Sequence, residues 1–305
     1  MLLKSPELDL KLVTRFRREA VAASRLVHEN CVHVDDFGDT IPSTLHAQRI
    51  VSLSPVTTEL LFALGAGGRV VGRTHWDSYP AEARAVPDVG DGMQPNIEAV
   101  LGTRPDLVVL YASASNRSAA RRLRQAGVAT IAMHQDRADD FRRTARVLGL
   151  ALGDSARGAA LGDRVLAEIQ AVRTSTTRAD GPPAPHPSIF WHVWDAPVYT
   201  IGSSSYLDEL VSAAGAVNIF GDRPESAPQV SLEEVVRRDP DFVLAGPTSA
   251  PKLLVNPAWR AVRAVREGRV LVMDTALVGR PGMSTASNAS PVWSHTCTRL
   301  CIPPC

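Results

Sequence analysis

Two blocks of sequence recur in the same order, with one copy of each block in either half of the chain. Residues 59–65 (ELLFALG) match residues 209–215 (ELVSAAG), and each position is shifted by 150 residues. Residues 97–108 (IEAVLGTRPDLV) match residues 232–243 (LEEVVRRDPDFV), with a shift of 135 residues. Because two independent blocks repeat in one order, the sequence predicts two copies of a single structural unit.

The first copy indicates what this unit contains. Residues 50–54 form an apolar, β-branched run that ends in serine, and Pro55 follows it. Apolar residues then recur at helical spacing until Gly65, where a helix would end. We expect a strand that leads directly into a helix. Open α/β folds bind ligands at such strand exits, because the helix N-terminus offers unpaired N–H groups and a partial positive charge.

The pattern along the whole chain predicts an α/β fold, with two Rossmann-like lobes joined by a long backbone helix. Between residues 137 and 178 only helix formers occur, although glycines there leave open whether they form one helix or a bent pair. The expected boundaries are an N-terminal extension at 1–47, a first lobe at 48–135, a linker helix at 136–180, a second lobe at 187–282 and an irregular tail at 283–305.

Bulk composition excludes several classes of partner. The chain has 33 basic and 32 acidic side chains, so its net charge of +1 gives no reason to expect nucleic acid or an anionic membrane as a partner. No apolar run is long enough for a membrane span, and the N-terminus lacks the apolar core of a secretory signal. Cys31 stands alone and three cysteines crowd the last nine residues, so we expect no disulfide framework in the body.

Residues 48 to 282 resemble the cobalamin and iron-siderophore class of ABC-transporter substrate-binding proteins. The resemblance rests on the two lobes and on residues 96–98 (NIE) and 228–234 (PQVSLEE), which begin equivalent helices. It implies a monomeric, non-enzymatic protein that works outside the cytoplasmic membrane, in the periplasm of a bacterium that has one. The resemblance also implies that the ligand is captured in a cleft between the lobes, with little hinge motion, and delivered to an ABC permease driven by its ATPase.

Three motifs resemble the cobalamin-binding branch of that class, namely residues 76–80 (WDSYP), 190–195 (FWHVWD) and 280–282 (RPG). The resemblance therefore implies cobalamin as the ligand, with a ferric siderophore or haem as the alternative and no resident cofactor. Residues 92–93 are Gly-Met, where some relatives place a further aromatic residue. This difference weakens the assignment of the ligand.

Aromatic residues cluster at strands and strand exits that we expect to face the cleft. Large, rigid rings suit a broad, flat corrin, although the same residues could simply fill a core. Trp191 and Trp194 lie three residues apart, so both reach one face of a strand only if a bulge intervenes. By family position, Arg280 matches an arginine of the cleft. The predicted ligand contacts are Trp76, Tyr79, Tyr111, Trp194 and Arg280.

Glu98 and Glu233 occupy equivalent positions in the repeat and admit two interpretations. Each lies in the first turn of a predicted helix, where a carboxylate offsets the helix dipole, and Ser231 with Glu234 would form a capping box. In the family that the chain resembles, glutamates at these two positions pair with arginines of the permease. We favour docking, because a dipole role alone would not fix both positions.

Metal and nucleophile chemistry have little support. His75, His134 and His192 have no carboxylate or histidine at metal-binding spacing, so a hydrogen-bonding or ligand-facing role is favoured and no metal site is expected. The residues around Cys297 and Cys301 are rich in proline, which favours an irregular tail over a zinc site. No catalytic residue is expected, since residues 202–205 (GSSS) lack the nucleophile-elbow pattern.

The N-terminal segment carries a second, shorter resemblance. Residues 15–20 (RFRREA) and 28–32 (HENCV) resemble the αC helix and the next strand of bacterial Ser/Thr kinases, with Glu19 at the position of the helix glutamate. The chain has no glycine-rich phosphate loop and no catalytic loop, so residues 36–38 (DFG) are not a kinase motif. A fragment of a kinase-like regulator is therefore only a distant alternative.

Overall fold

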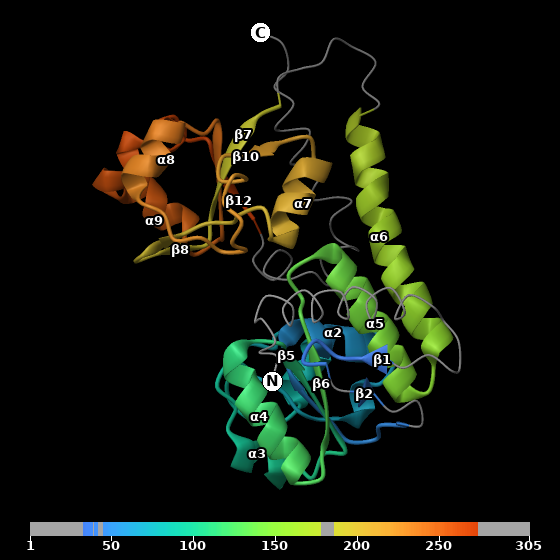
Figure 1. Cartoon of the computed structure of the whole chain (residues 1–305). Helices are drawn as coiled ribbons and strands as arrows, with labels where there is room; N and C mark the ends of the chain where they lie inside the picture. The colour runs from blue at the N-terminus through green and yellow to red at the C-terminus, as the bar shows by residue number, and fades with distance from the viewer. Residues whose placement is uncertain (1–32, 39, 42–44, 178–185, 274–305) are drawn as a thin grey trace, which may run out of the picture. The chain divides into compact units, whose positions relative to one another are not determined.

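The computed structural model describes residues 33–38, 40–41, 45–177 and 186–273. The contacts between residues divide the chain into two compact units (Figure 1). The first unit contains the described residues up to 77 together with 82–134 and 144–159. The second unit contains 78–81, 135–143 and the described residues from 160 onward.

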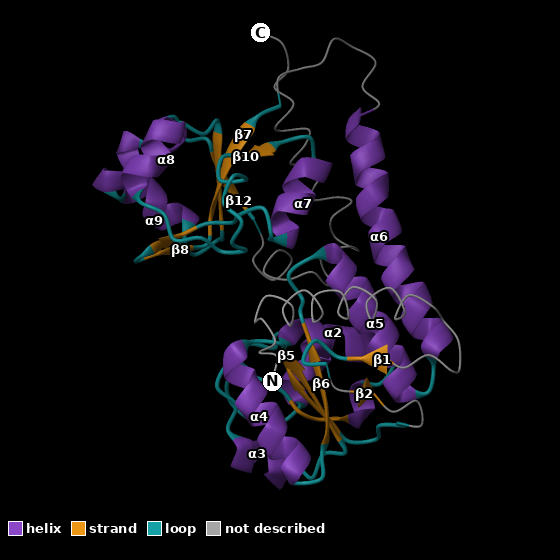
Figure 2. Cartoon of the chain, viewed as in Figure 1, coloured by secondary structure: helices purple, strands orange, loops and turns teal. Residues whose placement is uncertain are grey.

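The first unit is built on a four-stranded parallel sheet in the order β4-β3-β5-β6. Figure 2 shows strands β5 and β6 of this sheet in orange, with helices in purple. The helices of the unit follow the strands in the alternation that the sequence predicts. The strands are β3 (Ile50–Leu53), β4 (Val70–Gly72), β5 (Leu107–Tyr111) and β6 (Ala129–Met133). The helices are α2 (Pro55–Ala63), α3 (Ile97–Gly102) and α4 (Ala114–Gln125), with 3-10 turns η1 (Gly67–Arg69) and η2 (Ala81–Ala85) beside them.

The second unit has its own parallel sheet, in the order β10-β7-β11-β12. A short antiparallel pair, β8 with β9, follows its first strand. The strands are β7 (Ser188–His192), β8 (Trp194–Asp195), β9 (Val198–Tyr199), β10 (Val217–Asn218), β11 (Phe242–Ala245) and β12 (Val270–Val272). The helices are α7 (Tyr206–Ala213), α8 (Leu232–Arg238), α9 (Ala250–Val255), the 3-10 turn η3 (Pro257–Ala261) and α10 (Arg263–Arg266).

The two sheets share one topology, which confirms the predicted duplication. In each unit the four parallel strands, numbered along the chain, lie in the spatial order 2-1-3-4. Gly65 after α2 and Gly215 after α7 both have a positive φ, of 76° and 75°. Arg104 and Asp239 are the non-glycine residues with positive φ in the described part of the chain, and they too are separated by 135 positions.

The repeated Pro-Asp dipeptide performs the same structural task in both units. The Asp106 carboxylate accepts hydrogen bonds from the backbone N–H groups of Gln48 and Arg49, at 2.8 and 3.0 Å, just before β3 begins. The Asp241 carboxylate accepts bonds from the backbone N–H and the hydroxyl of Ser188 at the start of β7, at 2.9 and 2.8 Å. Each aspartate thus joins the start of the third strand of its unit to the start of the first.

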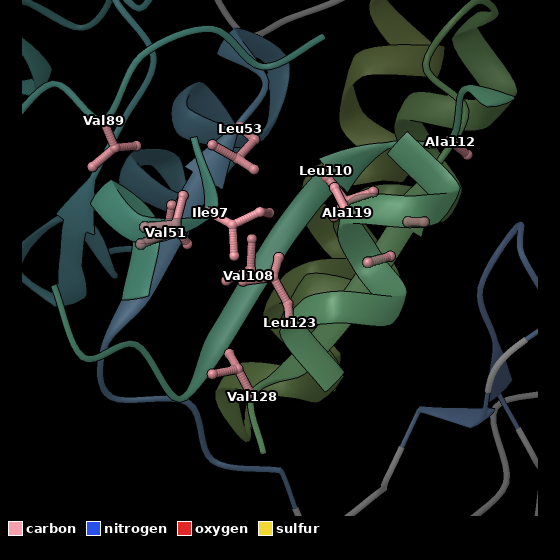
Figure 3. Close-up of a cluster of buried hydrophobic side chains, with 13 residues drawn as sticks. Val51, Leu53, Val89, Ile97, Val108, Leu110, Ala112, Ala119, Leu123 and Val128 are labelled. Atoms are coloured by element: carbon pink, nitrogen blue, oxygen red, sulfur yellow. The ribbon is translucent and has the colours of Figure 1, made fainter. Parts of the chain in front are cut away.

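One part of the core of the first unit lies between its sheet and the helices α3 and α4, while Ile50, Val109 and Ile131, whose side chains alternate with those of this cluster along the strands, are equally buried. Val51 and Leu53 of β3 point to the same face as Val108 and Leu110 of β5, as alternation along a strand requires. Figure 3 shows this cluster, in which the side chains of β5 meet Leu123 of α4. Burial of these side chains contributes roughly 25 cal/mol per Å² of apolar surface, which stabilises the frame from which the loops emerge.

In the second unit both faces of the sheet are covered. Ile189 and Trp191 of β7 pack with Leu210 of α7 on one face. Phe190, between them in sequence, packs with Trp259 on the other face, together with residues from α8, α9 and α10. A strand buried on both faces is expected to read as a continuous apolar run, as β7 does.

The helical stretch after β6 is two helices, α5 (Ala138–Leu152) and α6 (Ser155–Thr177), rather than one continuous helix. Of the two alternatives left open by the sequence, the bent pair is therefore the one observed. A Cβ on Gly149 would lie 2.7 Å from Cα of Gly158, so these glycines allow the two helices to approach closely. Among the described helices, none combines the length and apolar character needed to cross a membrane.

The described part of the N-terminal extension contacts the first unit. A short hairpin of β1 (His33–Val34) and β2 (Thr40–Ile41) surrounds residues 35–38. The Asp36 backbone N–H donates to the Ala132 carbonyl of β6 at 2.8 Å, and Asp35 accepts from the Ala132 N–H at 3.0 Å. The guanidinium of Arg117 lies 4.4 Å from the centre of the Phe37 ring. Residues 36–38 thus serve packing in this fold, while Glu19 lies outside the described residues.

Candidate ligand-binding and docking residues

The strand order of each sheet creates a switch point at its carboxyl edge. In the first unit the chain leaves β3 toward β4 on one side, while β5 lies on the other. In the second unit β7 has the same position between β10 and β11. Open parallel sheets bind ligands outside the carboxyl ends of such strands. The predicted ligand residues described by the structure follow strands at this edge.

Trp76 and Tyr79 lie on the loop after β4. Trp76 is 60% exposed, and its ring is 4.5 Å from the ring of His75, measured between centres. Tyr79 is half-buried and precedes Pro80 through a cis peptide bond. The exposed indole leaves an apolar surface available for a ligand in this unit.

Tyr111 ends β5 and is half-buried, with its ring edge-on to His134 at 5.7 Å between centres. Beside it, the buried side-chain amide of Asn116 donates to the Tyr111 carbonyl at 3.0 Å and to the Gly92 carbonyl at 2.9 Å. A Cβ on Gly92 would lie 2.1 Å from the Leu53 carbonyl oxygen. The glycine is thus required by the close passage of this loop over the end of β3.

The second unit separates Trp191 from Trp194. Strand β7 stops at His192, and Trp194 begins the antiparallel pair of β8 and β9, so the two tryptophans do not share one strand. Trp191 is consequently 5% exposed and belongs to the core, whereas Trp194 is 64% exposed. The Trp194 indole N–H donates to the Ala196 carbonyl at 3.3 Å, within its own turn.

His192 ends β7 and is buried beside Trp259, whose ring is edge-on at 5.4 Å between centres. Its Nε2 lies 3.6 Å from the Asp195 carboxylate, beyond direct hydrogen-bond distance. Burial lowers the pKa of His192, and the nearby Asp195 carboxylate opposes that shift only in part. His192 is therefore a neutral core histidine at neutral pH rather than a ligand-facing one.

Glu98 and Glu233 lie in the first turns of α3 and α8, as predicted, and both are exposed. Asn96 caps α3, since its side-chain oxygen accepts from the N–H groups of Glu98 and Ala99. Neither Glu98 nor Glu233 forms an ion pair with any described residue. Hydrogen bonds from its own backbone N–H and from the Ser231 hydroxyl lower the pKa of Glu233. The Glu233 carboxylate is thus charged at neutral pH, and both side chains are exposed.

One of the two hydrogen bonds of the predicted capping box at α8 is formed. The Ser231 hydroxyl oxygen accepts from the Glu234 backbone N–H at 3.1 Å, as the motif requires. The Glu234 carboxylate, however, accepts hydrogen bonds from Arg223 and Arg238, at 3.0 and 2.9 Å. Glu234 is therefore held by two arginines of the second unit, while its neighbour Glu233 forms no ion pair with a described residue.

Some predicted residues lie outside the described part of the chain. Arg280 and the terminal cysteines belong to residues 274–305, which the structure does not describe. Within the described residues, no three His, Cys, Asp or Glu side chains come close enough together to hold a metal ion.

Sequence reasoning missed two aspartates that directly follow the exposed tryptophans. Asp77 follows Trp76 and is 1% exposed, and its carboxylate accepts hydrogen bonds from the hydroxyls of Thr58 and Thr74, both at 2.7 Å. Asp195 follows Trp194 and accepts from the Trp259 indole N–H at 3.0 Å. The Trp-Asp dipeptide, present at both places, was the signal available in the sequence.

Comparison with known proteins agrees with this architecture. The family described as periplasmic binding protein matches residues 50–277. An uncharacterized ABC transporter substrate-binding lipoprotein of Bacillus subtilis is 29% identical over 77% of this chain and 75% of its own. A cobalamin-binding protein of Halobacterium salinarum is 31% identical, covering 77% of this chain and 65% of its own. The solved structure of the periplasmic haem-binding protein RhuT of Roseiflexus superposes with a TM-score of 0.71, at 26% identity over 82% of this chain and 99% of its own.

The family match spans both predicted lobes, and the structural likeness extends over nearly all of a two-lobed binding protein. Such proteins take part in transport and are not enzymes. The chain belongs to the periplasmic binding protein family, as a substrate-binding protein of the ABC-transporter type.

Proposed function

We propose that this protein captures cobalamin outside the cytoplasmic membrane and delivers it to an ABC permease. Its relatives include proteins named for cobalamin and for haem, so the ligand class is a large, flat tetrapyrrole or a comparable metal chelate. The main support for a corrinoid is the pair of tryptophans exposed at carboxyl edges, Trp76 at 60% and Trp194 at 64%. Indole rings left open to solvent in this way offer the flat apolar surfaces that a corrin needs.

Tyr79 and Tyr111 would add an amphipathic contact each in this proposal. Both are half-buried, so each presents part of its ring while the remainder packs in the protein. A phenol supplies apolar area and one hydrogen-bonding oxygen, which suits the amide groups around a corrin. Arg280 is proposed as a cleft residue on the family position alone.

Haem is the second candidate, and one observation favours it. His75 is exposed and lies against Trp76 on the same loop. An exposed imidazole can ligate the iron of haem, while the adjacent indole packs on the porphyrin. A ferric siderophore, the third possibility, would need neither the imidazole ligand nor the flat surface.

Glu98 and Glu233 are proposed as the contacts to the permease. Each is exposed and forms no ion pair with a described residue, and each lies in the first turn of the equivalent helix of its unit. Two like charges at repeated positions suit a partner with two basic sites. Charged groups at the rim of an interface mainly orient the encounter and set its rate.

The ligand assignment is tested by titrating the purified full chain with cyanocobalamin and with ferric haem in a calorimeter. We expect cyanocobalamin to bind with a Kd of about 1 µM or tighter, and Trp76→Ala or Trp194→Ala to weaken it by about 30-fold, as for an aromatic hot spot. Val255→Ala, at a valine 74% exposed on α9, is the matched control and should bind normally. Silence with cyanocobalamin and a clear response to haem or a ferric chelate would overturn the assignment.

A further inference from the structure

Each exposed tryptophan is followed by an aspartate whose carboxylate is bonded to the body of its own unit. The two sites are not copies produced by the duplication. Trp76 follows the second strand of its unit, β4, whereas Trp194 follows the first strand of the other, β7. An exposed tryptophan followed by a bonded aspartate thus occurs at two positions that the repeat does not relate. This indicates that each exposed tryptophan needs the aspartate beside it.

In the first unit the aspartate is fully buried. One oxygen of Asp77 accepts from the Thr58 hydroxyl at 2.7 Å and from the Thr74 backbone N–H at 3.1 Å, while the other accepts from the Thr74 hydroxyl at 2.7 Å. Thr58 lies on α2 and is itself buried, as is Thr74. The carboxylate therefore joins the loop to α2, and the backbone next to it, at Trp76, is held in place.

In the second unit the aspartate is at the surface but bonds to the core. Trp259 is 2% exposed and packs on Phe190, with 5.8 Å between ring centres, and its indole N–H donates to Asp195. Asp195 pairs with Val198 in the β8–β9 ladder, and Trp194 pairs with Tyr199. A core tryptophan thus fixes the hairpin that presents the exposed one.

We propose that Asp77 and Asp195 are positioning residues, which hold Trp76 and Trp194 in the orientation that binds the ligand. The proposal rests on the proposed function, because it assigns the two tryptophans to the ligand. An indole already held in its bound orientation loses less conformational freedom on binding, and one side chain ordered in advance is worth about 2- to 12-fold in affinity. Neither aspartate needs to touch the ligand itself.

The test at Asp195 combines a ligand-free measurement with a binding cycle. The chain has five tryptophans, so 5-fluorotryptophan NMR of the free protein should give five signals, with Trp194 assigned as the one lost in Trp194→Ala. We expect Asp195→Ala to shift and narrow the Trp194 signal as the ring becomes mobile. Asp195→Asn should preserve the signal, since its side-chain oxygen can still accept from Trp259.

In the binding measurements, Asp195→Ala should lower the affinity for cyanocobalamin by about 5-fold in the otherwise wild-type protein. The same substitution should leave the affinity unchanged when it is added to Trp194→Ala. An equal loss in both backgrounds, or an unaltered Trp194 signal in Asp195→Ala, would overturn the positioning role. A third outcome is that Trp194→Ala binds cyanocobalamin as the wild type does while Asp195→Ala still makes the ring of Trp194 mobile. In that outcome Trp194 does not contact the ligand, and the proposed function fails at this residue, although the hydrogen bond from Trp259 to Asp195 does order the Trp194 ring.

The test at the first site uses Thr58, because removing the buried Asp77 can unfold the unit. Thr58→Val deletes the hydroxyl that donates to Asp77 and keeps the shape of the side chain. Thr58→Ser keeps the hydroxyl and is the matched control. We expect Thr58→Val to lower the affinity for cyanocobalamin by about 3-fold, and to have no effect on it in the Trp76→Ala background. A full effect in the Trp76→Ala background, or an equal effect of Thr58→Ser, would overturn the assignment at this site.

Discussion

Arg104 of the first unit and Asp239 of the second adopt the same rare backbone conformation at equivalent positions, with φ of 52° and 43°. Both precede the Pro-Asp dipeptide that leads into the third strand of the unit. For a residue with a Cβ this conformation costs about 1–2 kcal/mol. The repeat has therefore preserved a strained turn as well as a pattern of side chains.

Glycine at position 104 should relieve this strain. The Arg104 side chain is exposed, so Arg104→Gly is expected to raise the free energy of unfolding by about 1 kcal/mol, after the greater freedom of glycine in the unfolded chain is counted. Urea denaturation at constant m-value measures the change. The Asp239→Gly variant is the contrast, since it also removes the ion pair to Arg263 at 2.9 Å and should gain less. A lower stability for Arg104→Gly would show that the turn is not strained.

Stability should fall in mild acid because of His192. Its pKa in the folded protein is lowered by burial, so below about pH 6.5 the unfolded chain binds a proton that the folded chain does not. The free energy of unfolding then decreases by up to about 1.4 kcal/mol per pH unit from this group, until the pH reaches the folded pKa.

The His192→Leu variant should lose this part of the pH dependence. Measurements of stability between pH 8 and pH 5 on both proteins isolate the contribution, and at pH 8 the difference between them reflects packing alone, because His192 is neutral in both states. An unchanged slope in His192→Leu would mean that other groups dominate the acid response.

Charge reversal at the proposed docking residues should uncouple delivery from capture. Glu98→Lys and Glu233→Lys are expected to lower ligand-dependent stimulation of the permease ATPase by about 10-fold each, since an unfavourable charge replaces a favourable one at the interface. Binding of the ligand by the free protein should stay within about 2-fold of wild type. Glu82→Lys, at an exposed glutamate on η2, is the matched control. Normal ATPase stimulation by both variants would remove these residues from the interface.

Alanine at position 92 should be costly. Its Cβ would lie 2.1 Å from the Leu53 carbonyl oxygen, which the backbone must move to avoid, and we expect a loss of about 3 kcal/mol. The matched control is Gly102→Ala at the end of α3, where a Cβ would meet no atom within 4 Å and a small gain is expected. Thermal unfolding compares the two variants. Equal melting temperatures would show that the loop at Gly92 yields easily.

The duplication and most elements could be predicted, because their signals are local. Asn96 and Ser231 cap their helices through bonds that span two or three residues, and Pro55 stands in the first turn of α2, where its ring fits. The break between α5 and α6 could be suspected from glycines but not placed. It depends on the contact between Gly149 and Gly158, which only the folded pair reveals.

The site was harder to predict, because its supports are distant in sequence. Trp191 and Trp194 belong to one apolar, aromatic run with strand propensity throughout, so the end of β7 at His192 could not be seen. Asp77 reaches Thr58 across 19 residues, and Asp195 reaches Trp259 across 64. Hydrogen bonds of this range leave no periodic trace in a single sequence.

The passage of Gly92 over the end of β3 has a consequence for how the ligand can be changed. A larger residue cannot be introduced there by substitution alone, since the path of the main chain forbids it. Met93, the next residue in the chain, is half exposed, so its side chain is less constrained. A change of ligand that calls for an aromatic side chain at position 92 would therefore require a different path of the loop as well as the substitution.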